Sequence, residues 1–308
     1  MKHEKIFSVI DALKEKYLGI LEEVCNIESP TDYKEGIDRV GRYFINLAEK
    51  MGWKIEVSLQ KVAGDAVCIT VNPDAKKPPI AVSGHMDTVH PVGSFGEHPI
   101  VRREGERMYG PGVTDCKGGI VAALLAMDAL FESGFTSRPV RLLLQSDEEN
   151  GSQFSDKATI NYICEKSKDS IAFLNLERMS NGKACLIRKG ILNYEFNITG
   201  TEAHAANCAT EGANAIAEAA HKILELEKLK DKDGITCSCG VIVGGSASNT
   251  VPLNCTFKAN IRFATQQQLE WVTSYVQEIA DTVYVPGCSC EATLLSKRVA
   301  MEFCDRNV

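Results

Sequence analysis

The alternation of short apolar strands with helices over roughly the first 180 residues constrains the fold most. Apolar or β-branched runs predict strands at residues 53–57, 66–71, 80–83, 138–145 and 171–176. Helical periodicity predicts helices at residues 9–27, 35–51, 121–131 and 156–165. Strands that alternate with helices in this way form a layered α/β fold with a largely parallel sheet.

The pattern changes after about residue 188. It predicts strands at residues 192–199, 236–243 and 256–263, and helices at residues 214–226 and 267–280. These elements form a small α+β unit of their own. Glycines and charged residues at 182–190 mark the boundary between the two units.

Composition excludes several classes of protein. Thirty-four basic against 41 acidic residues give a net charge of −7, so the basic surface that binds nucleic acid is absent. Apolar runs such as 120–127 are too short to cross a bilayer, and the start of the sequence has no apolar signal region. The twelve cysteines are then expected to be reduced. We expect a soluble cytoplasmic protein without nucleic-acid or membrane partners.

The segment AVSGHMDTVHP contains the first chemically informative residues. His85 and Asp87 directly follow a short apolar strand, and ligand sites in open α/β sheets lie beyond the carboxyl ends of strands. An imidazole with a carboxylate two residues later suits a metal ligand that is oriented by a second acid. A single His-x-Asp pair remains weak evidence, because most histidines in enzymes bind no metal.

Carboxylates follow the other strands. Asp115 lies in the glycine-rich segment YGPGVTDCKGG, Asp147, Glu148 and Glu149 follow the strand at 138–145, and Glu177 follows the strand at 171–176. Taken singly, these acids also fit a helix cap or a solvated loop. Three successive carboxylates at one strand end repel one another unless a cation or protons compensate. Together with the histidine, the set suits one or two divalent metals.

With these motifs the chain resembles the M20 family of metallopeptidases, which includes glutamate carboxypeptidase, aminoacylase, acetylornithine deacetylase and succinyl-diaminopimelate desuccinylase. The matching segments occur in family order from near residue 5 to about residue 292: GHMDTV, YGPGVTDCKGG, SDEENGS, RKGILNYEFNITGTEAHA, EGANAI and SNTVP. The resemblance implies a zinc-peptidase-like catalytic domain at residues 1–187. It implies an inserted lid and dimerisation domain at 188–293, and the start of a return to the catalytic domain at 294–308.

The resemblance also implies a metal centre with two Zn²⁺ ions, for which Co²⁺ or Mn²⁺ could substitute. His85, Asp115 and Glu177 would bind one ion, and Asp115 and Glu149 the other, so that Asp115 bridges them. In the family the peptide bond after the bridging aspartate is cis, which corresponds to Asp115–Cys116 here. Cys116 itself is expected to be a small packed side chain.

Further roles are implied by the same resemblance. Asp87 would orient the histidine ligand, and Glu148 would be the general base. His204 would reach the active site of the partner subunit and stabilise the oxyanion. Asn249 and Arg262 would bind the carboxylate of the substrate. The alternatives are an ordinary surface histidine and an ordinary strand arginine.

One departure from the family pattern concerns the second metal. Family members supply a last histidine ligand after the lid, whereas no histidine follows His221 in this sequence. The second ion would keep only Asp115 and Glu149, fewer than the three protein ligands typical of catalytic zinc. We expect a truncated family member or a site completed by another group. His90 and His98 are candidates for that group.

The sequence therefore predicts a metal-dependent hydrolase that cleaves an amide bond in a small carboxylate-bearing peptide or N-acyl amino acid, and that dimerises through its lid. The main alternative is a truncated homologue that binds metal and dimerises without useful turnover. A third interpretation is a cysteine-based metal sensor, in which Cys237, Cys239, Cys288 and Cys290 meet around one zinc. Buried free thiols are the default for these residues.

Overall fold

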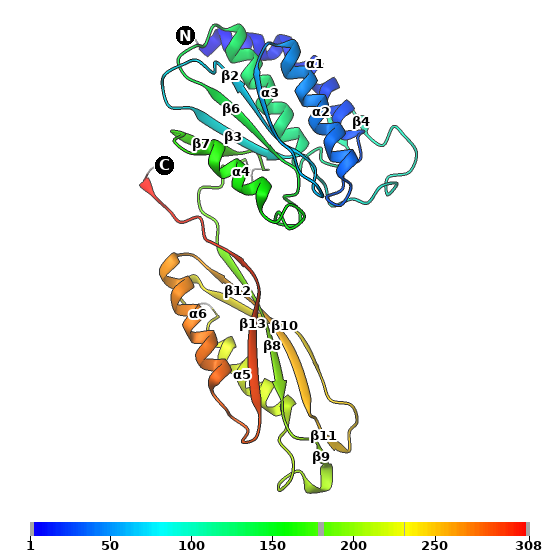
Figure 1. The fold of residues 1–308 in the computed structure, drawn as a ribbon, viewed down its shortest axis with the longest axis vertical. Coiled ribbons are helices and arrows are strands. Elements are labelled where there is room, and N and C mark those ends of the chain that lie inside the picture. Colours follow the sequence, from blue (N-terminus) through cyan, green and yellow to red (C-terminus); the bar gives the residue numbers. More distant parts are fainter. Residues whose placement is uncertain (1–2, 178–181, 231, 306–308) are drawn as a thin grey trace. The chain divides into compact units, whose positions relative to one another are not determined.

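The computed structural model describes residues 3–177, 182–230 and 232–305. It divides the chain into two compact units, residues 1–179 and 180–308, which are described separately below (Figure 1). No helix within the described residues combines the length and apolar character that crossing a membrane requires.

The first unit is an α/β layer structure. Its elements in chain order are α1 (His3–Cys25), α2 (Lys34–Lys50), β1 (Lys54–Ser58), β2 (Ala66–Val71), β3 (Ile80–His85), β4 (Arg102–Glu104), β5 (Arg107–Tyr109), α3 (Lys117–Glu132), β6 (Val140–Gln145), α4 (Ala158–Ser167) and β7 (Ala172–Asn175). Five strands form one sheet in the order β1-β2-β6-β3-β7. The parallel pairing predicted from the alternation holds for β6, β3 and β7, whereas β2 runs antiparallel to both of its neighbours, β1 and β6.

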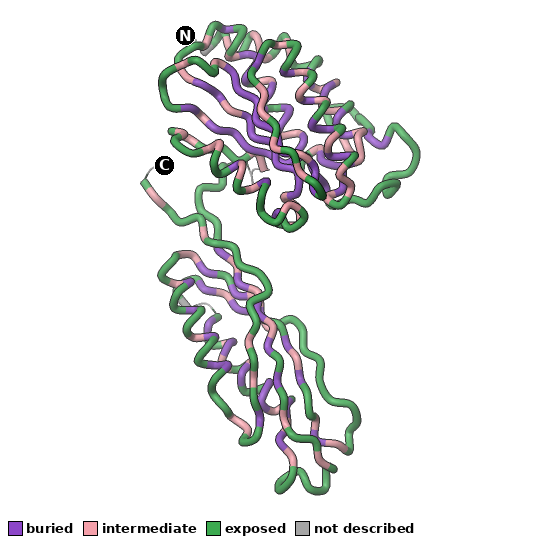
Figure 2. The backbone as a smooth tube through the Cα atoms, viewed as in Figure 1, coloured by how far each residue is buried: buried purple, intermediate pink, exposed green. Residues whose placement is uncertain are grey.

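Helices cover both faces of this sheet, with α1, α2 and α3 on one side and α4 on the other (Figure 1). The alternation of side chains along buried strands explains the two layers. In β6, Leu142 and Leu144 pack into the core beneath α1–α3, while Leu143 between them packs on the α4 side. Figure 2 shows the sheet strands as the most continuously buried part of the unit.

The second unit is an α+β sandwich in which two helices pack on a four-stranded sheet. Its elements are β8 (Gly190–Thr199), β9 (Ala203–His204), η1 (Ala205–Asn207), α5 (Ala215–Glu227), η2 (Lys232–Gly234), β10 (Thr236–Gly244), β11 (Thr250–Val251), β12 (Asn254–Phe263), α6 (Gln266–Asp281) and β13 (Ser289–Arg298). The antiparallel sheet has the order β10-β12-β8-β13. Phe196 and Phe257 stack face to face in the core under the helices. Because β13 runs to Arg298 within this sheet, the boundary expected at residue 293 falls inside a strand.

A fully buried ion pair ties α5 to the segment after α6. Lys222 and Glu218 lie 3.0 Å apart, and their side chains are 0% and 1% exposed. The Lys222 ammonium also donates to the carbonyl of Thr282 at 2.6 Å, and the Glu218 carboxylate accepts from the backbone N–H of Val285 at 2.6 Å. The pair therefore fixes residues 282–285 against the helix.

We expect Lys222→Met to lower the free energy of unfolding by about 3–5 kcal/mol, because the variant leaves the Glu218 carboxylate buried without its cation. Urea unfolding of the intact chain measures the change. Lys228→Met is the matched control, since Lys228 pairs with Glu225 on the surface of the same unit and such pairs contribute about 0–1 kcal/mol. Equal effects of the two substitutions would contradict a structural role for the buried pair.

Candidate metal centre

The carboxyl ends of three parallel strands bring the first group of polar residues together. In the register of the sheet, His85 at the end of β3 lies opposite Gln145 at the end of β6, and Ser83 lies opposite Asn175 at the end of β7. The residues that follow these strands, Asp87, Glu148 and Glu149, and Glu177, therefore emerge at one edge of the sheet.

Asp87 fixes the orientation of His85 through the Nδ1 atom of the ring. The imidazole is 2% exposed, and its Nδ1 lies 3.0 Å from the carbonyl oxygen and 3.3 Å from the carboxylate of Asp87. That carboxylate is fully buried and accepts hydrogen bonds from the Thr31 hydroxyl at 2.8 Å and from the backbone N–H groups of Glu148 and Glu149, each at 3.1 Å. One acid thus fixes both the histidine and the turn that carries the two glutamates.

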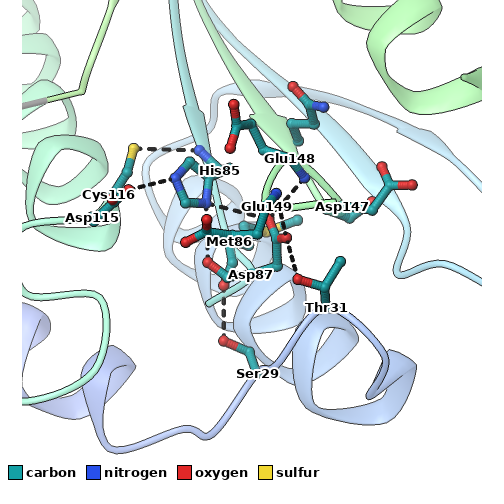
Figure 3. A network of polar contacts seen from close by, with 12 residues as sticks. Ser29, Thr31, His85, Met86, Asp87, Asp115, Cys116, Asp147, Glu148 and Glu149 are labelled. Atoms are coloured by element: carbon teal, nitrogen blue, oxygen red, sulfur yellow. Dashed lines mark hydrogen bonds and ion pairs between the residues drawn. The ribbon is translucent and has the colours of Figure 1, made fainter. Parts of the chain in front are cut away.

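The other nitrogen of His85 faces carboxylates. Nε2 lies 2.8 Å from Oδ1 of Asp115 and 3.4 Å from Oε1 of Glu177. Ligand atoms of His85, Asp115 and Glu149 lie within 4.8 Å of one another, and so do those of His85, Cys116 and Glu177. Figure 3 shows His85, Asp115 and Cys116 converging in this way.

The two glutamates of this centre, Glu148 and Glu149, have raised pKa values, and a bound cation would favour their ionised forms. Burial, together with the nearby carboxylates of Asp115, Asp87 and Glu148, raises the pKa of Glu149 to about 7, against the opposing charge of His85. Burial also raises the pKa of Glu148, and again the neighbouring carboxylates add to the effect. An imidazole nitrogen and several oxygens around one point form a donor set that fits a divalent metal.

A glycine-rich turn delivers Asp115. Gly112 has a φ of +77°, which favours glycine, and a Cβ on Gly119 would lie 2.3 Å from the carbonyl oxygen of Leu176. Only glycine therefore allows the start of α3 to approach the chain beside Glu177. The peptide bond between Asp115 and Cys116 is cis, as the family resemblance implies, and Cys116 is fully buried.

Asp147 is not part of this centre, although it directly precedes the two glutamates. Its carboxylate accepts from the Ser155 N–H at 2.9 Å and from the Thr159 hydroxyl. Figure 3 shows its side chain directed away from His85. Asp147 thus stabilises the loop that follows Glu149. The expectation of three carboxylates that repel one another at one point therefore applies only to Glu148 and Glu149.

The candidate residues of the second unit lie at two ends of its sheet. His204 pairs with Thr250 across β9 and β11, and the N–H of Ala205 donates to the carbonyl of Asn249 at 2.9 Å. Arg262 lies near the other end of β12, eight residues after Asn254. At about 3.3 Å per residue, this stretch of strand spans about 26 Å. The structure therefore brings His204 and Asn249 together and separates Arg262 from them within one chain.

The substitute histidines lie apart from the centre. His90 and His98 belong to a loop, residues 89–99, that is exposed throughout. His90 stacks edge-on against Phe95, and the nearest carboxylate to His98 is that of Glu28 at 3.9 Å. Neither histidine belongs to a potential metal-binding group among the residues that the structure describes.

The four-cysteine zinc site does not form. Cys237 lies in β10 and Cys290 in β13, the two edge strands of the sheet, with β12 and β8 between them. At about 4.8 Å between neighbouring strands, these positions are about 14 Å apart or more. The cysteines of both pairs are free thiols, as the default interpretation expects.

Comparisons with known proteins agree with this geometry. The sequence model of the peptidase dimerisation domain of the M20 family matches residues 186–288, and that of peptidase family M28 matches residues 66–232. Carboxypeptidase G2 of Pseudomonas sp. (strain RS-16) is 29% identical over 286 residues, which are 91% of this chain and 68% of that protein. Succinyl-diaminopimelate desuccinylase of Gluconobacter oxydans (strain 621H) is 26% identical over 214 residues, 66% of this chain and 56% of that protein.

A solved structure shares the fold. The YXEP protein of Bacillus subtilis, described as a dinuclear metal binding peptidase from the M20 family, superimposes with a TM-score of 0.66 at 14% identity, over 94% of this chain and 76% of that one. The chain spans about two thirds of the length of the carboxypeptidase and just over half that of the desuccinylase. Residues 66–232 also match peptidase family M28. The grouped acids and histidine, the second unit and these matches together show that the chain belongs to the M20 family of metallopeptidases, which are metal-dependent hydrolases.

Proposed function

We propose that the chain hydrolyses the amide or peptide bond of a small carboxylate-bearing substrate, either a peptide or an N-acyl amino acid. The observation that carries this proposal is the convergence of His85, Asp115 and Glu149 within 4.8 Å, directly beside the half-buried Glu148. The names of the relatives, a carboxypeptidase and desuccinylases, give the substrate class. Because these relatives are named as enzymes, a homologue without turnover is not favoured.

We propose zinc as the resident metal, held by His85, Asp115, Glu149 and Glu177, with Asp115 shared between two ions. Asp87 fixes the ring of His85 through Nδ1, so that Nε2 faces the cation. When bound, zinc would polarise the scissile carbonyl and lower the pKa of a nearby water.

Glu148 is the proposed general base. It takes a proton from the attacking water and returns it to the departing amine. Its raised pKa, caused first by burial, brings the group closer to neutral pH, where a carboxylate can both accept and return a proton. The backbone of Glu148 is held by Asp87 rather than by its own side chain, so the carboxylate remains available to the substrate.

The second unit would complete the site in a homodimer. We propose that His204 of one protomer stabilises the oxyanion in the partner's site, and that Asn249 and Arg262 bind the substrate carboxylate. The separation of Asn249 from Arg262 along the sheet supports contributions from different protomers. We place the protein in the cytoplasm, because all twelve cysteines are free thiols.

Amide hydrolysis by the intact chain tests the proposed function. Release of amino acid from dipeptides and N-acyl amino acids is followed by amine detection in chelator-free buffer with added zinc. We expect turnover that is abolished by a chelator and restored by zinc. Chelator-resistant turnover, or no turnover on any member of either substrate series, would contradict the proposal.

His204→Ala is expected to lower kcat about 10²–10³-fold, the range found when a single oxyanion donor is removed, and to leave metal content unchanged. The steady-state rate and elemental mass spectrometry are measured on the same sample. His221→Ala is the matched control, since His221 is an exposed histidine of the same unit that stacks on Tyr284. A normal rate for His204→Ala would make this histidine an ordinary surface residue.

Mixing two inactive variants tests the contribution of the partner. His204→Ala and Glu148→Ala chains are dissociated together and re-formed as dimers. About a quarter of the wild-type activity is expected, since half of the dimers are mixed and each of these holds one intact site. Absence of any recovery from a confirmed mixed dimer would place His204 outside the partner's active site.

A further inference from the structure

A pocket of the first unit adjoins the metal centre. It has a volume of about 300 Å³, at the small end of the range for ligand sites. Glu149, one of the proposed metal ligands, forms part of its wall. Thr31, whose hydroxyl donates to Asp87, forms another part. A substrate whose scissile carbonyl lies at the metal centre would therefore have this space directly beside it.

The pocket has an apolar surface that the fold leaves exposed. Val89, Pro91 and Phe154 line it from two separate loops, and Val89 and Phe154 are 62% and 41% exposed. The aromatic ring and the two aliphatic side chains offer contact area to an apolar group, and burying such area favours binding by about 25 cal/mol per Å². These loops carry no side chain of the proposed metal ligands other than Glu149.

A hydroxyl without a partner also belongs to this wall. Thr88 is 2% exposed and lines the pocket, and its Oγ1 has no hydrogen-bond partner among the described residues. A buried hydroxyl without a partner costs free energy and is uncommon in folded proteins. A polar atom of a bound molecule would supply that partner.

The charge of the pocket restricts what it can hold. Asp32 and Glu149 are the charged residues that line it, and no lysine or arginine lies among its described lining residues. Asp32 is exposed. An incoming carboxylate would meet the like charge of Asp32 and no lysine or arginine of the pocket wall, which disfavours its binding.

We propose that this pocket is the subsite for the acyl side of the substrate, and that it selects an uncharged apolar group with the size of an aliphatic or single-ring side chain. This inference rests on the proposed function. The pocket discriminates against acyl groups that end in a carboxylate, so the negative charge of the substrate lies on the leaving amino acid. Phe154 and Val89 determine the preference for apolar groups, and Asp32 determines the exclusion of acids.

Binding of hydroxamic acids to the zinc-loaded chain tests this assignment without requiring turnover. Acetohydroxamate, 3-phenylpropanohydroxamate and succinic acid monohydroxamate share the metal-binding group and differ only in the acyl side. Isothermal titration calorimetry gives the ratio of affinities. For the wild type we expect the phenylpropano compound to bind at least about tenfold more tightly than acetohydroxamate, through the buried ring area. We expect the succinic compound to show no such gain.

Two variants and a control make the test specific. Phe154→Ala should reduce the phenylpropano-to-aceto ratio to below about threefold, and Asp32→Asn should raise the relative affinity of the succinic compound severalfold. Phe7→Ala, a substitution of an exposed ring on α1, should leave both ratios as in the wild type.

A wild-type ratio near one, or a ratio that Phe154→Ala does not change, would overturn the subsite while the proposed function stands. Failure of acetohydroxamate itself to bind the zinc-loaded chain would overturn the proposed metal centre and the subsite with it.

Discussion

The Glu148→Ala variant is expected to lose about 10²–10⁴-fold in kcat while it keeps its full metal content. The size of the loss is that of removing a positioned general base. Metal is retained because Glu148 is not among the grouped ligand atoms of His85, Asp115 and Glu149. The rate of amide hydrolysis and the metal content by elemental mass spectrometry, measured on one preparation, give both parts of the result.

Two further variants define the role of the Glu148 carboxylate. Glu148→Gln keeps the size and the hydrogen-bonding capacity of the side chain, so it should be as inactive as Glu148→Ala if proton transfer is the function. Glu148→Asp keeps the carboxylate but withdraws it by one methylene, and should retain part of the rate. Normal turnover in Glu148→Gln would exclude this residue as the base.

Asp115→Ala is expected to lose both activity and metal, with at least about a 100-fold decrease in zinc affinity, since outer-shell changes alone cost 10–100-fold. Its carboxylate lies 2.8 Å from Nε2 of His85 and is 56% exposed. The substitution therefore removes a ligand without opening a cavity in the core. Competition with a chromophoric chelator measures the affinity.

The matched control for this loss is Asp11→Ala, which removes an exposed carboxylate from α1 and should leave zinc affinity unchanged. The circular dichroism of each variant reports whether the fold is intact. A folded Asp115→Ala protein with wild-type zinc content would contradict a bridging role for Asp115.

Much of the first unit could be predicted because its central strands β2, β3 and β6 are buried along almost their whole length. Consecutive apolar residues such as Leu142–Leu144 mark these strands, and the polar residues that follow them emerge at the ends of neighbouring strands. The sequence did not reveal that β1 and β2 are antiparallel. The seven residues between Ser58 and Ala66 are too few for the crossover that parallel strands need. The length of this connection therefore predicts an antiparallel pair.

Strand β13 is not among the strands that the sequence pattern predicts. It is an edge strand, and most of its residues are exposed. Exposed edges carry charged and polar side chains, so residues 289–298 lack the apolar alternation by which strands are recognised. Its pairing with β8 is a tertiary contact that local periodicity does not encode.

The sequence indicates which residues gather at the candidate site, but not the direction in which each side chain points. By position alone the three consecutive acids after β6 are equivalent, and the hydrogen bonds of Asp147 to the loop after it show that this carboxylate turns away from His85. Likewise, a spacing of 13 residues between Asn249 and Arg262 does not reveal that they lie at different ends of a sheet. Both distinctions depend on the direction of the backbone after a strand, which residue type alone does not determine.

The most direct test of the central claim is an anomalous difference map from crystals of the intact chain grown with zinc and recorded at the zinc absorption edge. The account predicts an anomalous peak about 2.0–2.1 Å from Nε2 of His85 and about 2.0–2.2 Å from a carboxylate oxygen of Asp115. Zinc bound elsewhere, with no peak between these two residues, would contradict the assignment of this cluster as the metal centre of a hydrolase.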